Sequence, residues 1–195
     1  MHQQSRSARA FSRRTLLSTT LIAATALAGS ALILEGRDAQ AQGVDRSPQI
    51  KAACIYNFVK FVDWPDRVLP ANNTLVIGVL GQSPVGSALT GLNGKSAKNR
   101  TLVVRQLSSP GEVRNCQVVF VSPSELGRLG QFVEAAHDAS VLTVGDSDGF
   151  ARAGGVINFI EQGNRVRFEI NSAAAEKSKL TISSQLLRLA KITGG

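Results

Sequence analysis

The sequence predicts an α/β fold, a three-layer sandwich with a mostly parallel central sheet and a C-terminal antiparallel hairpin. Short apolar segments rich in valine, typical of strands buried on both faces, alternate with segments whose apolar residues recur at helical spacing. This alternation favours parallel strands that helices cover on both faces. Near the C terminus, two strand-like segments flank a tight Gly/Asn turn, which indicates the hairpin.

The first predicted helix begins near Ile50 and ends at Trp64-Pro65. Its apolar positions recur at helical spacing until the proline interrupts the pattern: Ile50, Cys54, Phe58, Phe61 and Val62. Four compact apolar segments follow along the chain as predicted strands: Thr74–Leu80, Thr101–Leu107, Gln117–Val121 and Val141–Val144.

Two further helices are predicted between these strands. A short helix begins at Ser83-Pro84, where the proline occupies a favourable first-turn position, and continues through Ala88 and Leu92. A longer amphipathic helix spans Ser122–Asp138. The predicted order of elements is therefore consistent with a layered α/β domain.

The predicted hairpin pairs Val156–Glu161 with Arg165–Ile170. Arg165 and Arg167 project from one face of its second strand, with Glu169 in the same register. A solvated ladder of cross-strand charges is one interpretation, and an acidic ligand or partner is the other.

Two capped helices complete the predicted domain. Asn171 is a predicted N-cap for a helix over Ala173–Lys177. Ser183 or Ser184 is the predicted N-cap of a final helix that carries Leu186, Leu187 and Leu189.

Residues 1–41 have the pattern of an export signal. Four arginines precede an uncharged run over Thr15–Leu34, and Ala39-Gln40-Ala41 supplies the small residues that signal peptidase recognises. The pair Arg13-Arg14 resembles a twin-arginine signal, while Sec export and a membrane anchor remain alternatives. We expect cleavage after Ala41, leaving a single domain over residues 42–195 in the periplasm.

Composition narrows the classes of function. The chain has 195 residues, of which 43% are hydrophobic and 18% charged, values typical of a globular protein. Without residues 1–41, it has 17 basic and 12 acidic side chains, dispersed without a basic stripe, so nucleic-acid binding has little support. The two cysteines fit no structural zinc pattern. We expect no cofactor, no metal site and no enzymatic activity, because no nucleophile, base and orienting group can be nominated together.

Three motifs allow a chemical and a structural interpretation. Gly78, Gly81 and Gly86 follow or lie within the first strand, but their spacing fits a strand-to-helix turn better than a phosphate loop. Asp146-Ser147-Asp148-Gly149 resembles the start of a calcium loop without its later ligands, which favours a glycine-rich turn. His137 closes an amphipathic helix, where capping or surface exposure is the expected role and catalysis the alternative.

Cys54 and Cys116 are the only cysteines in the predicted mature chain. Export to an oxidising compartment makes a disulfide between them possible, closing a loop of about 60 residues and contributing ~4 kcal/mol by chain entropy. Two buried reduced thiols are the alternative, since both residues lie in apolar surroundings. We expect the disulfide.

Four separated segments strongly resemble the YfiR family, in the right order and over nearly all of residues 48–193. They are the segment from Ile50 to Pro65, Asp146 to Gly155, Asn164 to Asn171 with Ala173 to Ala175, and Ile182 to Ala190. The resemblance implies a periplasmic α/β protein that dimerises and acts by binding. It also implies repression of an inner-membrane diguanylate cyclase through the periplasmic sensor region of that enzyme, with effects on cyclic di-GMP and biofilm formation. An outer-membrane lipoprotein that withdraws the repressor is a further implied partner.

Aromatic side chains concentrate on the first helix, an arrangement suited to packing or protein recognition. Those on the Cys54 face are expected to be buried. The candidate partner-binding residues lie elsewhere on that helix and on the hairpin: Tyr56, Lys60, Trp64, Arg165 and Arg167. A second function remains open, a periplasmic small-ligand-binding protein that feeds a membrane sensor kinase or transporter, with its pocket at the C-terminal edge of the strands.

Overall fold

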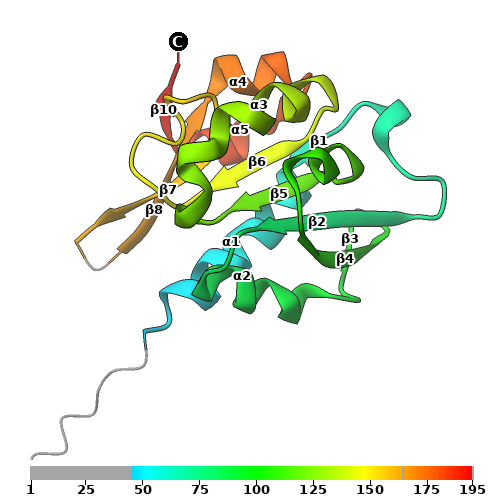
Figure 1. The fold of residues 1–195 in the computed structure, drawn as a ribbon, viewed down its shortest axis with the longest axis horizontal. Helices are drawn as coiled ribbons and strands as arrows, with labels where there is room; N and C mark the ends of the chain where they lie inside the picture. Colours follow the sequence, from blue (N-terminus) through cyan, green and yellow to red (C-terminus); the bar gives the residue numbers. More distant parts are fainter. Residues whose placement is uncertain (1–44, 164, 195) are drawn as a thin grey trace, which may run out of the picture. The chain divides into compact units, whose positions relative to one another are not determined.

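The computed structural model describes residues 45–163 and 165–194, so the predicted signal peptide at 1–41 lies outside the described residues. Its main sheet has the strand order β10-β8-β7-β6-β5-β2-β4-β3 (Figure 1). Five parallel neighbours form the centre: β2 (Thr74–Leu80), β4 (Arg100–Leu107), β5 (Val118–Val121), β6 (Leu142–Gly145) and β7 (Ile157–Gln162). The mostly parallel α/β fold predicted from the sequence is confirmed.

The ends of this sheet contain the antiparallel pairs. At one end, β3 (Ser96–Ala97) is antiparallel to β4. At the other end, β8 (Arg165–Asn171) is antiparallel to β7, which confirms the hairpin, and β10 (Lys191–Thr193) is parallel to β8. In Figure 1 the β7–β8 hairpin projects from the body of the sheet.

Helices cover both faces of the sheet. On one face lie α1 (Ser47–Phe61) and α2 (Pro84–Leu89), and on the other lies α3 (Leu129–Asp138). Two short helices follow the hairpin, α4 (Ser172–Lys177) and α5 (Ser184–Leu187), and their buried residues belong to the core on the α1 side. The predicted three-layer arrangement is therefore present.

Strand β2 shows why the sheet needs both layers. Its residues alternate between the two faces, so Leu75 and Ile77 pack into the core under α1, while Val76 and Leu80 pack into the core under α3. All four are buried. A strand buried on both faces reads as a continuous apolar run, which is the pattern that predicted it.

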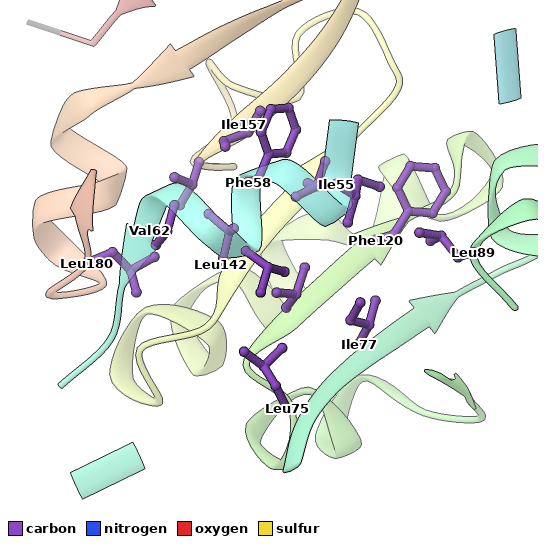
Figure 2. Packing of buried hydrophobic residues seen from close by; sticks show 14 of the residues in the cluster. Ile55, Phe58, Val62, Leu75, Ile77, Leu89, Phe120, Leu142, Ile157 and Leu180 are labelled. Carbon is purple, nitrogen blue, oxygen red and sulfur yellow. The ribbon is translucent and has the colours of Figure 1, made fainter. Parts of the chain in front are cut away.

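The centre of the α1 layer is made by Ile55, Phe58 and Val59, each at most 1% exposed. Figure 2 shows Ile55 and Phe58 in this layer. The ring of Phe58 lies 5.8 Å from that of Phe159 and 4.9 Å from that of Phe168, measured between centroids. These contacts join the first helix to both strands of the hairpin. Full burial of each such side chain stabilises the fold by about 1.5–3 kcal/mol.

The predicted caps at Asn171 and Ser183 are confirmed, and the structure adds a cap at Ser83. The hydroxyl of Ser83 accepts a hydrogen bond from Gly86 N, the amide oxygen of Asn171 accepts one from Ala174 N, and the hydroxyl of Ser183 accepts one from Gln185 N. Each satisfies a main-chain donor that the first turn of a helix leaves without a partner.

The helix predicted over Ser122–Asp138 is divided in the structure. Pro123–Arg128 form a 3-10 helix, and only Leu129–Asp138 is α-helical. Further short elements were not anticipated: 3-10 helices at Asp66–Val68, Thr90–Leu92 and Pro110–Asn115, and a separate antiparallel pair of β1 (Val62–Asp63) and β9 (Thr181–Ile182). Elements of two or three residues are too short for a periodic pattern to predict, and the six residues Pro110–Asn115 contain a single large apolar side chain, Val113.

The expected disulfide is wrong. Both cysteines are free thiols, because Cys54 packs against the core on the α1 side of the sheet and Cys116 belongs to the core on the α3 side. The sheet separates the two sulfur atoms. Burial raises the pKa of both thiols, that of Cys116 to about 11, so Cys116 stays protonated and poorly reactive at neutral pH.

The loop after β6 is built around Phe150, a buried ring in the core on the α3 side. A Cβ atom added at Gly145 or at Gly155 would overlap this ring. Both ends of the loop thus need glycine for steric reasons, and the ring holds the loop that carries Asp146.

We predict that Gly155→Ala lowers the free energy of unfolding by about 1–3 kcal/mol, because the Phe150 ring must move from a packed position. Gly130→Ala is the control, since an added Cβ in α3 has no atom within 4 Å and alanine favours the helix by about 0.5–1 kcal/mol. Denaturant unfolding of both variants measures the difference. Equal stabilities of the two variants would contradict the packing argument.

Candidate interaction surface

The N-terminal turn of α1 meets the β7–β8 hairpin around a buried lysine. Lys51 is 5% exposed, and its Nζ donates to both carboxylate oxygens of Asp146, at 2.8 and 2.9 Å. Glu161 Oε1, on β7, lies 3.5 Å from the same Nζ. One ammonium group therefore joins α1, the loop after β6 and the first strand of the hairpin.

This arrangement follows from the position of Lys51 on α1. The helix runs against the direction of the parallel strands, so its first turn lies where β6 ends and Asp146 begins the next loop. A buried ammonium is strongly destabilising unless a carboxylate neutralises it. The pairing thus ties the first turn of α1 to the loop after β6, which leads into the hairpin.

The hairpin presents two arginines on one face of β8. Arg165 and Arg167 are exposed, and their cross-strand neighbours are Gln162 and Ile160. Glu169 instead accepts a hydrogen bond from Asn158 Nδ2 at 3.1 Å. The charge ladder is therefore not formed, and within residues 45–163 and 165–194 neither arginine has an acidic partner.

Trp64, a candidate partner-binding residue, is buried in the structure. It is 7% exposed, packs in the core on the α1 side, and donates from Nε1 to the carbonyl oxygen of Gln117 at 3.0 Å. Gln117, also buried, in turn accepts from Val76 N at 2.9 Å and donates to Val68 O at 3.0 Å. The sequence position at the end of the helix did not reveal this buried polar network.

The other two candidates on α1 lie toward the opposite end of the sheet from the arginines. Tyr56 is half-buried, and its hydroxyl donates to the carbonyl oxygen of Ser96, in β3, at 2.9 Å. Lys60 is exposed, with its Nζ 5.4 Å from the centre of the Tyr56 ring. Because β3 and β8 lie near opposite ends of the strand order, the structure does not bring the predicted residues into one patch.

Sequence reasoning placed Ile50 on the buried face of the helix, but this side chain is 50% exposed. It lines a recess of about 440 Å³ together with Arg165, Val166 and Arg167. We call this recess and its four residues the hairpin surface. The signal that could have found it is the position of Ile50 in the first helical turn, before the helix reaches the sheet.

The C-terminal edge of the strands has a more polar recess of about 470 Å³, lined in part by Lys51, Asp146 and Asp148. Its lysine is already paired with Asp146. Among the described residues, no group of His, Cys, Asp and Glu has the arrangement of a metal site, and Asp146 acts as a salt-bridge partner.

Capping or surface exposure was expected for His137, but the structure shows this side chain buried. Its Nε2 lies 3.0 Å from the carbonyl oxygen of Gly154, so it connects the C-terminal turn of α3 with the loop around Phe150.

Gly78 packs against Cys116 and Leu107, and Gly81 has a φ of 77° in the turn after β2. Gly81 therefore has the expected role in a strand-to-helix turn, whereas Gly78 lies within β2, where an added Cβ atom would overlap the side chains of Cys116 and Leu107.

Comparison with known proteins identifies the family of this chain. The sequence profile of the YfiR/HmsC-like family matches residues 48–191, which include every element from the first turn of α1 to the start of β10. The chain belongs to the YfiR/HmsC-like family. Membership suggests a periplasmic regulator of cyclic di-GMP signalling. None of the helices within residues 45–194 that the structure describes is long and apolar enough to cross a membrane.

Two solved structures are distantly similar to this YfiR/HmsC-like protein. No protein with a curated description matches it. A conserved domain protein from Vibrio cholerae is 16% identical with a TM-score of 0.45, and an ABC domain from a Streptococcus species, solved with L-Trp, is 11% identical with a TM-score of 0.49. Each likeness covers 75% of this chain and 60% of the other chain.

We predict that Asp146→Ala lowers the free energy of unfolding by about 2–3 kcal/mol, because it leaves the Lys51 ammonium buried without its main partner. Asp148→Ala, at an exposed position two residues later, is the matched control and should change stability by less than about 0.5 kcal/mol. Chemical denaturation measures both. An equally small effect of the two substitutions would show that the ion pair does not hold the loop.

Proposed function

We propose that this YfiR/HmsC-like protein is a periplasmic regulatory binding protein that represses a membrane diguanylate cyclase through the periplasmic sensor region of that enzyme. The observation that carries the proposal is the family match over residues 48–191. Cleavage of residues 1–41 would deliver the domain to the compartment where such a sensor region is accessible.

The hairpin surface supports recognition of a protein. It combines an exposed isoleucine with two arginines that have no acidic partner among the described residues, and arginines are prominent among residues that dominate binding energy. A negatively charged region of a partner would supply the missing counter-charge. Homodimerisation and release by an outer-membrane lipoprotein belong to the same proposal.

Purification of the tagged mature protein from detergent-solubilised envelope tests this function. Recovery of a diguanylate cyclase supports the proposal. Recovery of a sensor kinase would retain a regulatory role with another enzyme. A retained small molecule without any membrane protein would favour the ligand-binding function instead.

We predict that the double substitution Arg165→Glu with Arg167→Glu raises cellular cyclic di-GMP and surface adhesion to the level of a deletion strain, because reversed charge repels an acidic partner. Arg114→Glu is the control. Arg114 is exposed on the 3-10 helix Pro110–Asn115, whose Val113 belongs to the core on the α3 side. The double variant changes the net charge by twice as much as this control, so the single variants Arg165→Glu and Arg167→Glu provide the comparison at equal charge.

Cyclic di-GMP quantification by mass spectrometry measures the effect, with the amount of folded protein in the periplasm checked in each strain. Full repression by the double variant would exclude Arg165 and Arg167 from the interface. An equal rise with Arg114→Glu would show that the effect reflects net charge and not this surface.

A further inference from the structure

The outer edge of β8 is only half covered. On its inner side, β8 pairs with β7 from Arg165 to Ile170. On its outer side, β10 pairs only with Glu169, Ile170 and Asn171. Within residues 45–163 and 165–194, no strand pairs with the outer edge from Arg165 to Phe168.

The hydrogen-bond phase of the hairpin shows which main-chain groups face outward. Asn171 N donates to Val156 O at 2.8 Å, so these two residues form a hydrogen-bonded pair. In an antiparallel ladder such pairs alternate with pairs whose main-chain groups point away from each other. Val166 pairs with Glu161 and lies five positions before Asn171 in this register. An odd number of steps places it in a pair whose main-chain groups point away from each other. Its N–H and C=O therefore point to the uncovered edge.

Side chains around this edge have two different characters. Val166 packs toward the core on the α1 side, where Ile50 is exposed beside it. Arg165 and Arg167 project from the opposite face of the strand. A strand added here would place alternate side chains against an apolar surface and against two guanidinium groups.

We propose, as a deepening of the proposed function on which it rests, that the partner adds an extended segment to the open edge of β8, in which apolar and acidic residues alternate. Main-chain hydrogen bonds to Val166 provide affinity, and the two faces of the added strand provide specificity. The apolar residues contact Ile50 and Val166, and the acidic residues contact Arg165 and Arg167.

A second copy of this chain fits the edge less well. Pairing two β8 edges about a twofold axis would bring the arginines of both copies close together, with no carboxylate opposite them. Charged residues on an exposed edge are a known means of preventing self-association. The same arginines attract an acidic strand, so charge complementarity selects the occupant.

The test uses a synthetic octapeptide in which valine and glutamate alternate, titrated into the mature protein and followed by NMR. Binding should slow hydrogen exchange at the Val166 amide, because that N–H becomes a hydrogen-bond donor to the peptide. A peptide in which lysine replaces glutamate should bind at least about tenfold more weakly, because it reverses the charge opposite the arginines.

Val166→Pro and Val166→Thr separate the main chain from the side chain. Proline removes an N–H that makes no bond to β7, so the hairpin can remain paired, whereas threonine keeps the N–H and the branched shape. Proline should weaken peptide binding about tenfold, the effect of one lost hydrogen bond, and threonine by less than about twofold. If the proline variant fails to fold, amide exchange in the unaltered protein still decides the question.

Several results would overturn the open-edge proposal. One is failure of the valine–glutamate peptide to bind at millimolar concentration, and another is binding that leaves Val166 exchange unchanged. Protection of Val166 that rises with protein concentration in the absence of peptide would identify a second copy as the occupant. If no peptide binds at the β8 edge but deletion of the gene still raises cyclic di-GMP, the proposed function stands and the open-edge proposal is wrong. If the peptide binds at this edge but deletion leaves cyclic di-GMP unchanged, the proposed function is wrong and the edge is still a binding site.

Discussion

The position of the hairpin surface depends on one buried positive charge. The Lys51 ammonium is neutralised by Asp146, at the end of β6, and lies near Glu161 on β7. Removing such a group from water costs several kcal/mol, which the protein recovers only when the carboxylates are in place. The first turn of α1, the loop around Phe150 and the hairpin are consequently held in one arrangement, with Ile50 beside the edge of β8.

Much of the fold could be predicted because local and tertiary requirements agree. The continuous apolar run of β2 reflects burial on both faces, and Asn171 occupies the position where α4 needs a side-chain acceptor. The turn between Gln162 and Arg165 is short enough to force an antiparallel pair. In each of these cases a few neighbouring residues determine the structure.

The misinterpreted residues depend on contacts between distant segments. Trp64 looked exposed at a helix end, but its indole nitrogen finds a carbonyl 53 residues away. The cysteines looked like partners until the sheet placed them on opposite faces. Lys51 was overlooked, since a lysine on a helix is normally solvated and its carboxylate partner is 95 residues away. No local pattern reports which charge will be buried.

The hairpin combines two features that suit binding of an extended segment, a rigid base and a strand edge that β10 covers only in part. Phe159 and Phe168, one from each strand, contact Phe58 of α1, so the strands are anchored at their middle. Beyond this anchor, β10 leaves the outer edge of β8 uncovered from Arg165 to Phe168. Because Phe58 already holds the two strands in place, binding to them costs little conformational entropy. The uncovered edge of β8 supplies N–H and C=O groups that can form directional hydrogen bonds with a partner.

Site-specific photo-crosslinking in living cells tests most directly whether this face is the one that meets the membrane enzyme. A photoreactive amino acid would replace Arg167 on β8 or, in a second strain, Arg105, which is exposed on β4 near the other end of the strand order. We expect an adduct with a diguanylate cyclase from position 167 and none from position 105. Adducts formed from position 105 alone would place the partner at the other end of the sheet and contradict the account.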